Sequence, residues 1–196
     1  STSKIKITNF DSLEKIDLTN IDIIIDSSGK KEDINILKSL PVSAIFLTHP
    51  NNEADINVIL GVNEKDLNPN IHKIISTSSC NATALLPALK LKKEKKEILC
   101  GDILTVHPLL NHQRVLDGSF VKSDTRDVNC NFEFGRSSTQ NIIPNKTTTI
   151  KACSFVLANI NQNLISSSSL RVPTDTVGAI NVSLFTKEKS TKNEII

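Results

Sequence analysis

The chain has 196 residues, of which 38% are hydrophobic and 22% are charged, and its formal net charge is +2. This length allows one substantial core or two modest domains, which excludes a short peptide module. The near balance of charge, and the absence of aromatic residues among the lysines of residues 90–96, argue against a nucleic-acid-binding surface. No apolar run reaches the ~20 residues of a membrane-spanning helix, and no signal peptide opens the sequence, so we expect a soluble cytoplasmic protein.

The first part of the chain predicts a parallel sheet. Residues 30–40 place apolar side chains at near-helical spacing and end before Pro41. A helix between two strands implies a parallel pair with a right-handed crossover. Short Ile, Val and Leu runs bounded by turn residues predict buried strands on either side of this helix, at residues 5–7, 21–25, 42–47, 58–60 and 74–76.

The pattern changes after residue 79. Apolar residues recur at helical spacing from Ala82 to Leu89, which predicts a helix that begins near Cys80. The strand expected at residues 177–185 alternates as a half-buried antiparallel strand does. The other elements expected here are strands at residues 103–106 and 168–172, a helix over residues 145–160 and a polar surface loop over residues 119–134.

Cysteine usage predicts one reactive thiol. The four cysteines, Cys80, Cys100, Cys130 and Cys153, are far apart and form no C-x-x-C pair, so no metal site is expected. Disulfides are not expected in a reducing compartment. Cys80 differs from the others because it lies where a predicted strand gives way to a predicted helix.

Cys80 and His107 form the candidate catalytic pair. The partial positive charge at a helix N-terminus favours the thiolate form of a cysteine, which is the nucleophile. A nucleophilic thiol also needs a base. His107 follows 27 residues later, directly after the apolar run 103–106, and that strand is expected to return it beside the start of the helix.

Five short motifs then lead to a family. They are Gly61-Val62-Asn63, Ser79-Cys80-Asn81-Ala82-Thr83, Thr105-Val106-His107, Gln140-Asn141-Ile142-Ile143-Pro144 and Leu170-Arg171-Val172-Pro173-Thr174. In type and order they resemble G-V-N, S-C-T-T-N, the histidine segment, Q-N-I-I-P and R-V-P-T of phosphorylating glyceraldehyde-3-phosphate dehydrogenases. The printed sequence has no G-x-G-x-x-G run, the dinucleotide fingerprint with which that family begins.

The resemblance implies an α/β plus α+β fold in two parts. Residues 1–79 are expected to be the C-terminal part of the NAD-binding domain, a remnant of a Rossmann-type parallel sheet. Residues 80–196 are expected to be most of the catalytic domain, with a mostly antiparallel sheet covered by helices. A homotetramer is the assembly that the resemblance implies.

The resemblance also implies a reaction. Cys80 attacks the aldehyde of glyceraldehyde 3-phosphate, hydride passes to NAD, with NADP not excluded, and inorganic phosphate releases the acyl group as 1,3-bisphosphoglycerate. His107 is expected to form an ion pair with the thiolate and act as general base. The residues expected to bind substrate or phosphate are Ser79, Asn81, Thr147, Thr148 and Arg171, and those expected near the cofactor are Ser28, Gly29 and Thr48.

Three alternatives stay open at the level of the sequence. Leu110 stands where the family has a phosphate-binding hydroxyl, which is more similar to erythrose-4-phosphate dehydrogenase, where water resolves the thioester. The chain could instead be a non-catalytic relative that keeps the fold for assembly or binding. Thr147 and Thr148 could simply cap the helix that follows them.

Overall fold

The structure is a computed structural model that describes residues 7, 9, 15–28, 32–95, 97–111, 113–118, 132–157, 160–189 and 191–194. The described residues form two sheets with helices around and between them. In chain order the elements are β1 (Ile23–Asp26), α1 (Ile34–Ser39), β2 (Ala44–Leu47), β3 (Ile56–Asn57), the 3-10 helix η2 (Glu64–Asp66), β4 (Ile74–Ser76), α2 (Cys80–Lys95), β5 (Ile98–His107), α3 (Phe132–Gly135), β6 (Ile143–Asn145), α4 (Thr149–Val156), β7 (Ile165–Arg171), β8 (Ala179–Thr186) and the 3-10 helix η3 (Lys192–Glu194).

The first sheet is parallel, as the sequence predicts. Its strand order is β1-β2-β4-β3, and every pairing in it is parallel. The predicted strand at residues 58–60 is wrong by two positions, since β3 ends at Asn57. The chain turns after Asn57 because the Asn63 side chain accepts a hydrogen bond from the backbone of Ile59 (2.9 Å). The predicted run 5–7 lies mostly outside the described residues.

Strand β1 is covered on one face only, although its run of isoleucines predicts a fully buried strand. Ile24 packs against the small core of the first sheet, whereas Ile23 and Ile25 are 54% and 69% exposed. Side chains alternate between the faces of a strand, and the described residues cover only one face of β1. The expectation of a fully buried strand is therefore wrong here, because an apolar run alone does not say whether both faces are covered.

The second sheet is mixed, with two antiparallel pairings and one parallel pairing. Its order is β6-β7-β5-β8. Strand β5 runs parallel to β7 and antiparallel to β8, and β6 is antiparallel to β7. Residues 143–145 form β6, so the helix predicted over residues 145–160 is shorter and begins at Thr149. Most of the loop predicted at 119–134 lies outside the described residues.

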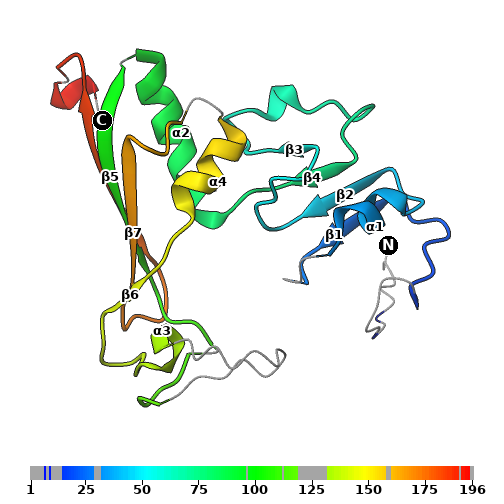
Figure 1. Ribbon diagram of the computed structural model, residues 1–196, viewed down its shortest axis with the longest axis horizontal. Helices are drawn as coiled ribbons and strands as arrows, with labels where there is room; N and C mark the ends of the chain where they lie inside the picture. Colours follow the sequence, from blue (N-terminus) through cyan, green and yellow to red (C-terminus); the bar gives the residue numbers. More distant parts are fainter. Residues whose placement is uncertain are drawn as a thin grey trace, which may run out of the picture.

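Helices α2 and α4 lie between the two sheets (Figure 1). The main core contains Leu85 and Leu86 of α2, Cys153 of α4 and Ile103 of β5, all at most 1% exposed. The apolar stripe predicted on α2 therefore packs against α4 and the second sheet. Among the described residues no helix combines the length and the apolar character that crossing a membrane requires.

Buried asparagines hold the segment after β3. Asn63 donates from Nδ2 to the carbonyl of Asn57 (2.9 Å), and Asn57 donates from Nδ2 to the carbonyl of Asn51 (2.7 Å). Gly61 has a φ of +79°, a conformation that suits glycine. Lys90 of α2 donates from Nζ to the carbonyl of Val62 (2.6 Å). The segment that contains the G-V-N motif thus fixes α2 against the first sheet.

The buried stripe of α2 predicts a stability test. Leu86 is fully buried in the main core, so Leu86→Ala leaves a cavity and is expected to lower the free energy of unfolding by about 2–5 kcal/mol in urea denaturation. Leu116 is 77% exposed, and Leu116→Ala serves as the matched control, with an expected change below about 0.5 kcal/mol. Equal losses from the two variants would contradict the packing described here.

Candidate active site

A strained turn delivers Cys80 to the start of α2. Ser78, which follows β4 after one residue, has a φ of +64°, a left-handed conformation that is uncommon for residues other than glycine. Its backbone N–H donates to Ser76 Oγ (3.1 Å), which stabilises the turn. Ser79 Oγ accepts from the backbone N–H of Ala82 (3.3 Å) and so caps the helix. Cys80 is the first helical residue, as the sequence predicts.

Cys80 is exposed, and its thiol is close to a neighbouring amide. Sγ donates to Asn81 Oδ1 at 3.9 Å, a distance compatible with a weak sulfur hydrogen bond. Cys100 is also exposed, whereas Cys153 is buried, and burial raises the pKa of the Cys153 thiol to about 12. Cys130 lies outside the described residues. Two described cysteines are therefore accessible, and only Cys80 stands at a helix N-terminus.

The pairing of β5 with β7 places His107 beside Arg171. The two residues are partners in the parallel ladder, each at the last position of its strand. Side chains of paired residues share a face, and Thr105, two residues before His107, is fully buried on that face. His107 and Arg171 therefore emerge together at the end of the face that α2 and α4 cover.

Electrostatics connects this pair to the cysteine. Burial, and secondly the positive charge of Arg171, lower the pKa of His107 below its ordinary value of 6.5. Burial also lowers the pKa of Arg171, and the charge interaction between Arg171 and Cys80 acts on that pKa in the opposite direction. Within the described part of the chain, no hydrogen bond joins Cys80 to His107. Catalytic hydrogen bonds are often long in the absence of substrate.

The Arg171 guanidinium has an N–H donor that is available to bind an anion. Its Nη1 donates to the carbonyl of Pro108 (3.3 Å), which orients the guanidinium. Its Nε is buried and has no hydrogen-bond partner among the described residues. Buried polar groups are normally satisfied, so an unpaired guanidinium N–H next to a helix N-terminus suits an incoming phosphate or carboxylate oxygen.

Two of the predicted phosphate residues, Asn81 and Thr147, meet at the start of α4, but through a residue that the sequence did not single out. Thr149 Oγ1 accepts from Asn81 Nδ2 (3.0 Å) and shares a 2.6 Å hydrogen bond with Thr147 Oγ1. Thr147 Oγ1 also accepts from the backbone N–H of Thr149 (3.2 Å), which is a capping contact. Thr148 is the N-cap residue by position, is exposed, and makes no side-chain capping bond.

Two of the predicted cofactor residues lie elsewhere, at the carboxyl edge of the first sheet. Thr48 follows β2, and its Oγ1 donates to the carbonyl of Asp26 at the end of β1 (3.2 Å). The backbone N–H of Ser28 donates to Asp26 Oδ1 (2.9 Å). Both residues are exposed, and Gly29 lies outside the described residues. Nucleotides bind at this edge in open α/β sheets.

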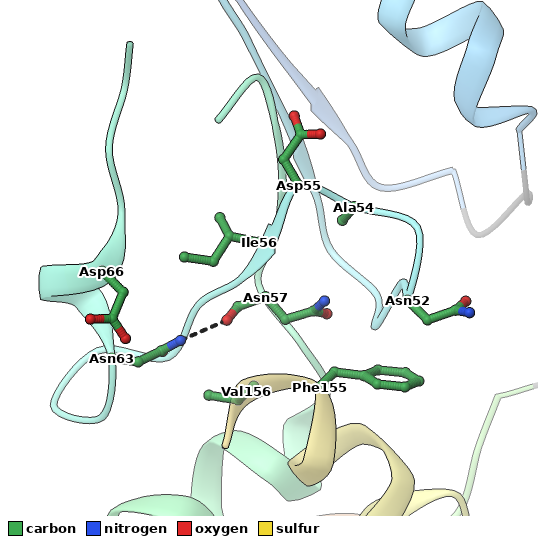
Figure 2. A pocket seen from close by; sticks show the side chains of 9 residues that line it. All are labelled: Asn52, Ala54, Asp55, Ile56, Asn57, Asn63, Asp66, Phe155 and Val156. Atoms are coloured by element: carbon green, nitrogen blue, oxygen red, sulfur yellow. Dashed lines mark hydrogen bonds between the residues drawn. The ribbon is translucent and has the colours of Figure 1, made fainter. Parts of the chain in front are cut away.

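A separate pocket of about 310 Å³ lies between β3 and α4. Figure 2 shows Phe155 and Val156 of α4 facing a wall that includes Asn57 and Asn63, which are joined by their hydrogen bond. The two asparagine amides are already used in that wall. None of the predicted catalytic or phosphate-binding residues lines this pocket, so it is distinct from the group around Cys80.

Comparison with known proteins decides the family. Residues 79–196 match the family model described as "Glyceraldehyde 3-phosphate dehydrogenase, C-terminal domain". The chain belongs to the glyceraldehyde-3-phosphate dehydrogenase family. The resemblance inferred from the five motifs is confirmed, and so is the expected combination of a parallel sheet with a second sheet and its helices.

Curated relatives extend the similarity to both sheets. The chain is 32% identical over 179 residues to glyceraldehyde-3-phosphate dehydrogenase 2 of Streptomyces avermitilis, covering 90% of this chain and 50% of that protein. It is 31% identical over 178 residues to glyceraldehyde-3-phosphate dehydrogenase of Streptomyces coelicolor, covering 89% and 50%. It is 30% identical over 178 residues to glyceraldehyde-3-phosphate dehydrogenase 1 of Bacillus subtilis, covering 89% of this chain and 50% of that protein. The chain thus spans about half the length of these relatives.

The site predicts the titration of His107. We expect its imidazole to titrate below pH 6.5 in an NMR pH series, with the resonance assigned by its loss in His107→Gln. Arg171→Gln removes the positive charge beside His107, so the titration midpoint of His107 is expected to rise. It is expected to stay below 6.5, because the imidazole is still partly buried. Folding favours the neutral form of the His107 imidazole. The stability that this preference gives the folded state is therefore fully present above about pH 6.5 and is lost as the pH falls. A wild-type midpoint at or above 6.5 would contradict this account.

Proposed function

We propose that the protein to which this chain belongs oxidises a small phosphorylated aldehyde, glyceraldehyde 3-phosphate, through a thioester on Cys80. The observation that carries the proposal is the position of Cys80 at the N-terminus of α2, within electrostatic reach of Arg171, whose strand partner is His107. The family membership supports the same reaction class. The location in the cytoplasm and the homotetrameric assembly stay predictions.

The first step is addition of the thiol to the aldehyde. The Cys80 sulfur forms a bond to the carbonyl carbon, and the carbonyl oxygen takes up a proton to give a thiohemiacetal. Oxidation of that adduct to the thioester removes one hydride from carbon and one proton from the hydroxyl. His107 suits the role of proton acceptor because its lowered pKa keeps the imidazole neutral near pH 7.

Arg171 suits the recognition of the substrate's phosphate. A guanidinium presents several N–H donors in a fixed plane, which matches phosphate oxygens. The contact from Nη1 to the carbonyl of Pro108 holds this plane, and the unpaired Nε remains for a ligand. The charge of Arg171 also favours a neutral His107, so the same residue serves substrate binding and the state of the base.

NAD is the hydride acceptor that we propose, with NADP not excluded. The exposed hydroxyls of Ser28 and Thr48, at the ends of adjacent parallel strands, fit the polar edge that a nucleotide requires. When bound there, NAD would supply the chemistry of hydride acceptance. This chain contributes that edge, and its printed sequence contains no Gly-rich pyrophosphate loop.

The acyl acceptor distinguishes two versions of the proposal. Attack by inorganic phosphate gives 1,3-bisphosphoglycerate and regenerates the Cys80 thiol. Attack by water gives the free acid, as in erythrose-4-phosphate dehydrogenase, and Leu110 in place of a phosphate-binding hydroxyl favours this alternative. Phosphate stays the first proposal because Thr147 and Thr148, just before α4, are the residues expected to bind it.

Activity of the full-length protein tests the proposal. Purified full-length protein is expected to form NADH from glyceraldehyde 3-phosphate, and Cys80→Ser is expected to abolish turnover. Cys100→Ser is the matched control, because Cys100 is also exposed but lies within strand β5, and it is expected to leave the rate unchanged. His107→Asn is expected to lower kcat by about 10²–10⁴-fold. Full activity of Cys80→Ser would exclude the proposed nucleophile.

Substitution of Arg171 separates binding from chemistry. Arg171→Lys keeps the positive charge but loses the planar set of donors, so KM for glyceraldehyde 3-phosphate is expected to rise by about tenfold or more. Comparison with a non-phosphorylated aldehyde gives the control, since its KM is expected to be nearly unaffected. Equal effects on the two aldehydes would remove Arg171 from phosphate recognition.

A further inference from the structure

Lys90 joins the helix of the nucleophile to the parallel sheet. Its Nζ donates to the carbonyl of Val62 (2.6 Å) and to that of Gly61 (3.4 Å), in the turn between β3 and η2. Val62 is only 5% exposed, and within the described part of the chain no backbone N–H donates to either carbonyl. Buried carbonyls normally have a donor, so the ammonium group of Lys90 satisfies a turn that its own backbone does not.

Helix α2 is therefore attached to the parallel sheet at two points. At its start, a short turn leads from Ser76, the last residue of β4, to Cys80, the first residue of the helix. Lys90 lies further along the same helix, about 15 Å from Cys80 at a rise of about 1.5 Å per residue. With the first attachment alone, the helix could pivot about its start. The contact of Lys90 fixes the direction in which the helix runs from the sheet.

The direction of α2 also determines where the second sheet lies. The helix lies between the two sheets (Figure 1), and its fully buried Leu86 packs in the main core with α4 and β5. A close-packed core transmits a displacement instead of absorbing it, so the second sheet follows the helix. That sheet carries His107 and Arg171, whereas Ser28 and Thr48 lie at the carboxyl edge of the first sheet. The angle between the sheets thus sets the distance between these two groups of residues.

We propose that Lys90 is a positioning residue that fixes the angle between the two sheets and thereby the geometry of hydride transfer. This inference rests on the proposed function in taking hydride transfer as the step that needs both sheets. Addition of the Cys80 thiol involves α2 and the second sheet, and binding of NAD involves the edge of the first. A misplacement of about 1 Å can slow a reaction by about 10²-fold. Loss of the Lys90 contact therefore acts on hydride transfer more than on either binding step.

Lys73 provides a matched control within the first sheet. Its Nζ also donates to two carbonyls, those of Lys38 (2.8 Å) and Leu40 (2.6 Å), at the C-terminal end of α1. Lys73 directly precedes β4, so this contact joins two parts of the same sheet and its helix. Lys73→Met and Lys90→Met each remove an ammonium donor from two carbonyls, and both are expected to lower the urea midpoint of unfolding. Only Lys90→Met frees one sheet to move relative to the other.

Two reactions of the full-length protein separate positioning from stability. In Lys90→Met, NADH formation at saturating glyceraldehyde 3-phosphate and NAD is expected to fall about 10- to 100-fold, with both KM values nearly unchanged. Attack of Cys80 on p-nitrophenyl acetate releases p-nitrophenolate without hydride transfer, and its rate is expected to change by less than about twofold. Lys90→Arg keeps a cation with several donors and is expected to restore most of the NADH formation, and Lys73→Met is expected to retain it. Lys90→Gln, with a polar side chain too short for both carbonyls, replaces Lys90→Met if that variant does not fold.

Double electron–electron resonance measures the relation between the sheets without substrate or cofactor. Spin labels are attached by bioorthogonal chemistry at Asn35 of α1 and at Asn163 before β7, both exposed, so the cysteines stay unmodified. Labelled full-length protein is diluted with unlabelled protein, so that the measured distances lie within one chain. The distance distribution is expected to broaden in Lys90→Met and to stay as in the wild type in Lys73→Met.

The outcomes separate this inference from the proposed function. An unchanged distance distribution in the Lys90 variant, or the same broadening in Lys73→Met, would overturn the role of Lys90. An equal fall in NADH formation and in p-nitrophenolate release would overturn it as well. If instead the distribution broadens as expected while the wild-type protein forms no NADH from glyceraldehyde 3-phosphate, Lys90 does fix the sheets and the proposed reaction fails.

Discussion

The register between β5 and β7 is the constraint on which the candidate site depends. The two parallel strands pair from Gly101 with Ile165 to His107 with Arg171 without interruption. A shift by one residue would turn every side chain to the opposite face. His107 and Arg171 would then leave the face that the helices cover. The in-register ladder therefore positions the imidazole and the guanidinium together and allows one to influence the pKa of the other.

The cysteine reaches this face by a different route. The first sheet ends β4 at Ser76, and the left-handed Ser78 and the capping Ser79 redirect the chain into α2. Lys90 then fixes the far end of the same helix to the segment after β3. The parallel sheet thus contributes to the site even though its strands provide no catalytic group, because it determines where α2 begins. Strain at a turn next to a nucleophile is common in active sites.

Sequence reasoning was most successful where the signal was local and periodic. The helix that starts at Cys80 was predicted because its apolar stripe, from Ala82 to Leu89, is regular. The motifs that identified the family also indicated Cys80, His107 and Arg171, although no pattern in the sequence gives the strand register that makes His107 and Arg171 neighbours.

The errors have physical causes. Strand β3 was misplaced by two residues because the apolar run after it is held by a side chain, that of Asn63, and not by a ladder. The isoleucines of β1 could not reveal that one face is uncovered. Thr149 was missed although its neighbours Thr147 and Thr148 were predicted, because its importance comes from a contact with Asn81, far away in the sequence. Such tertiary contacts leave no periodic signal.

The most direct test of the account compares two exposed cysteines in the same molecule. With limiting iodoacetamide at pH 7, followed by peptide mapping, the account predicts that Cys80 is alkylated several-fold faster than Cys100, because Cys80 stands at the N-terminus of α2 and interacts with the charge of Arg171, whereas Cys100 lies within a strand. The faster reaction is expected to slow in Arg171→Leu, with Cys100 unaffected. Equal rates at Cys80 and Cys100 in the wild type would contradict the claim that Cys80 is placed for nucleophilic chemistry.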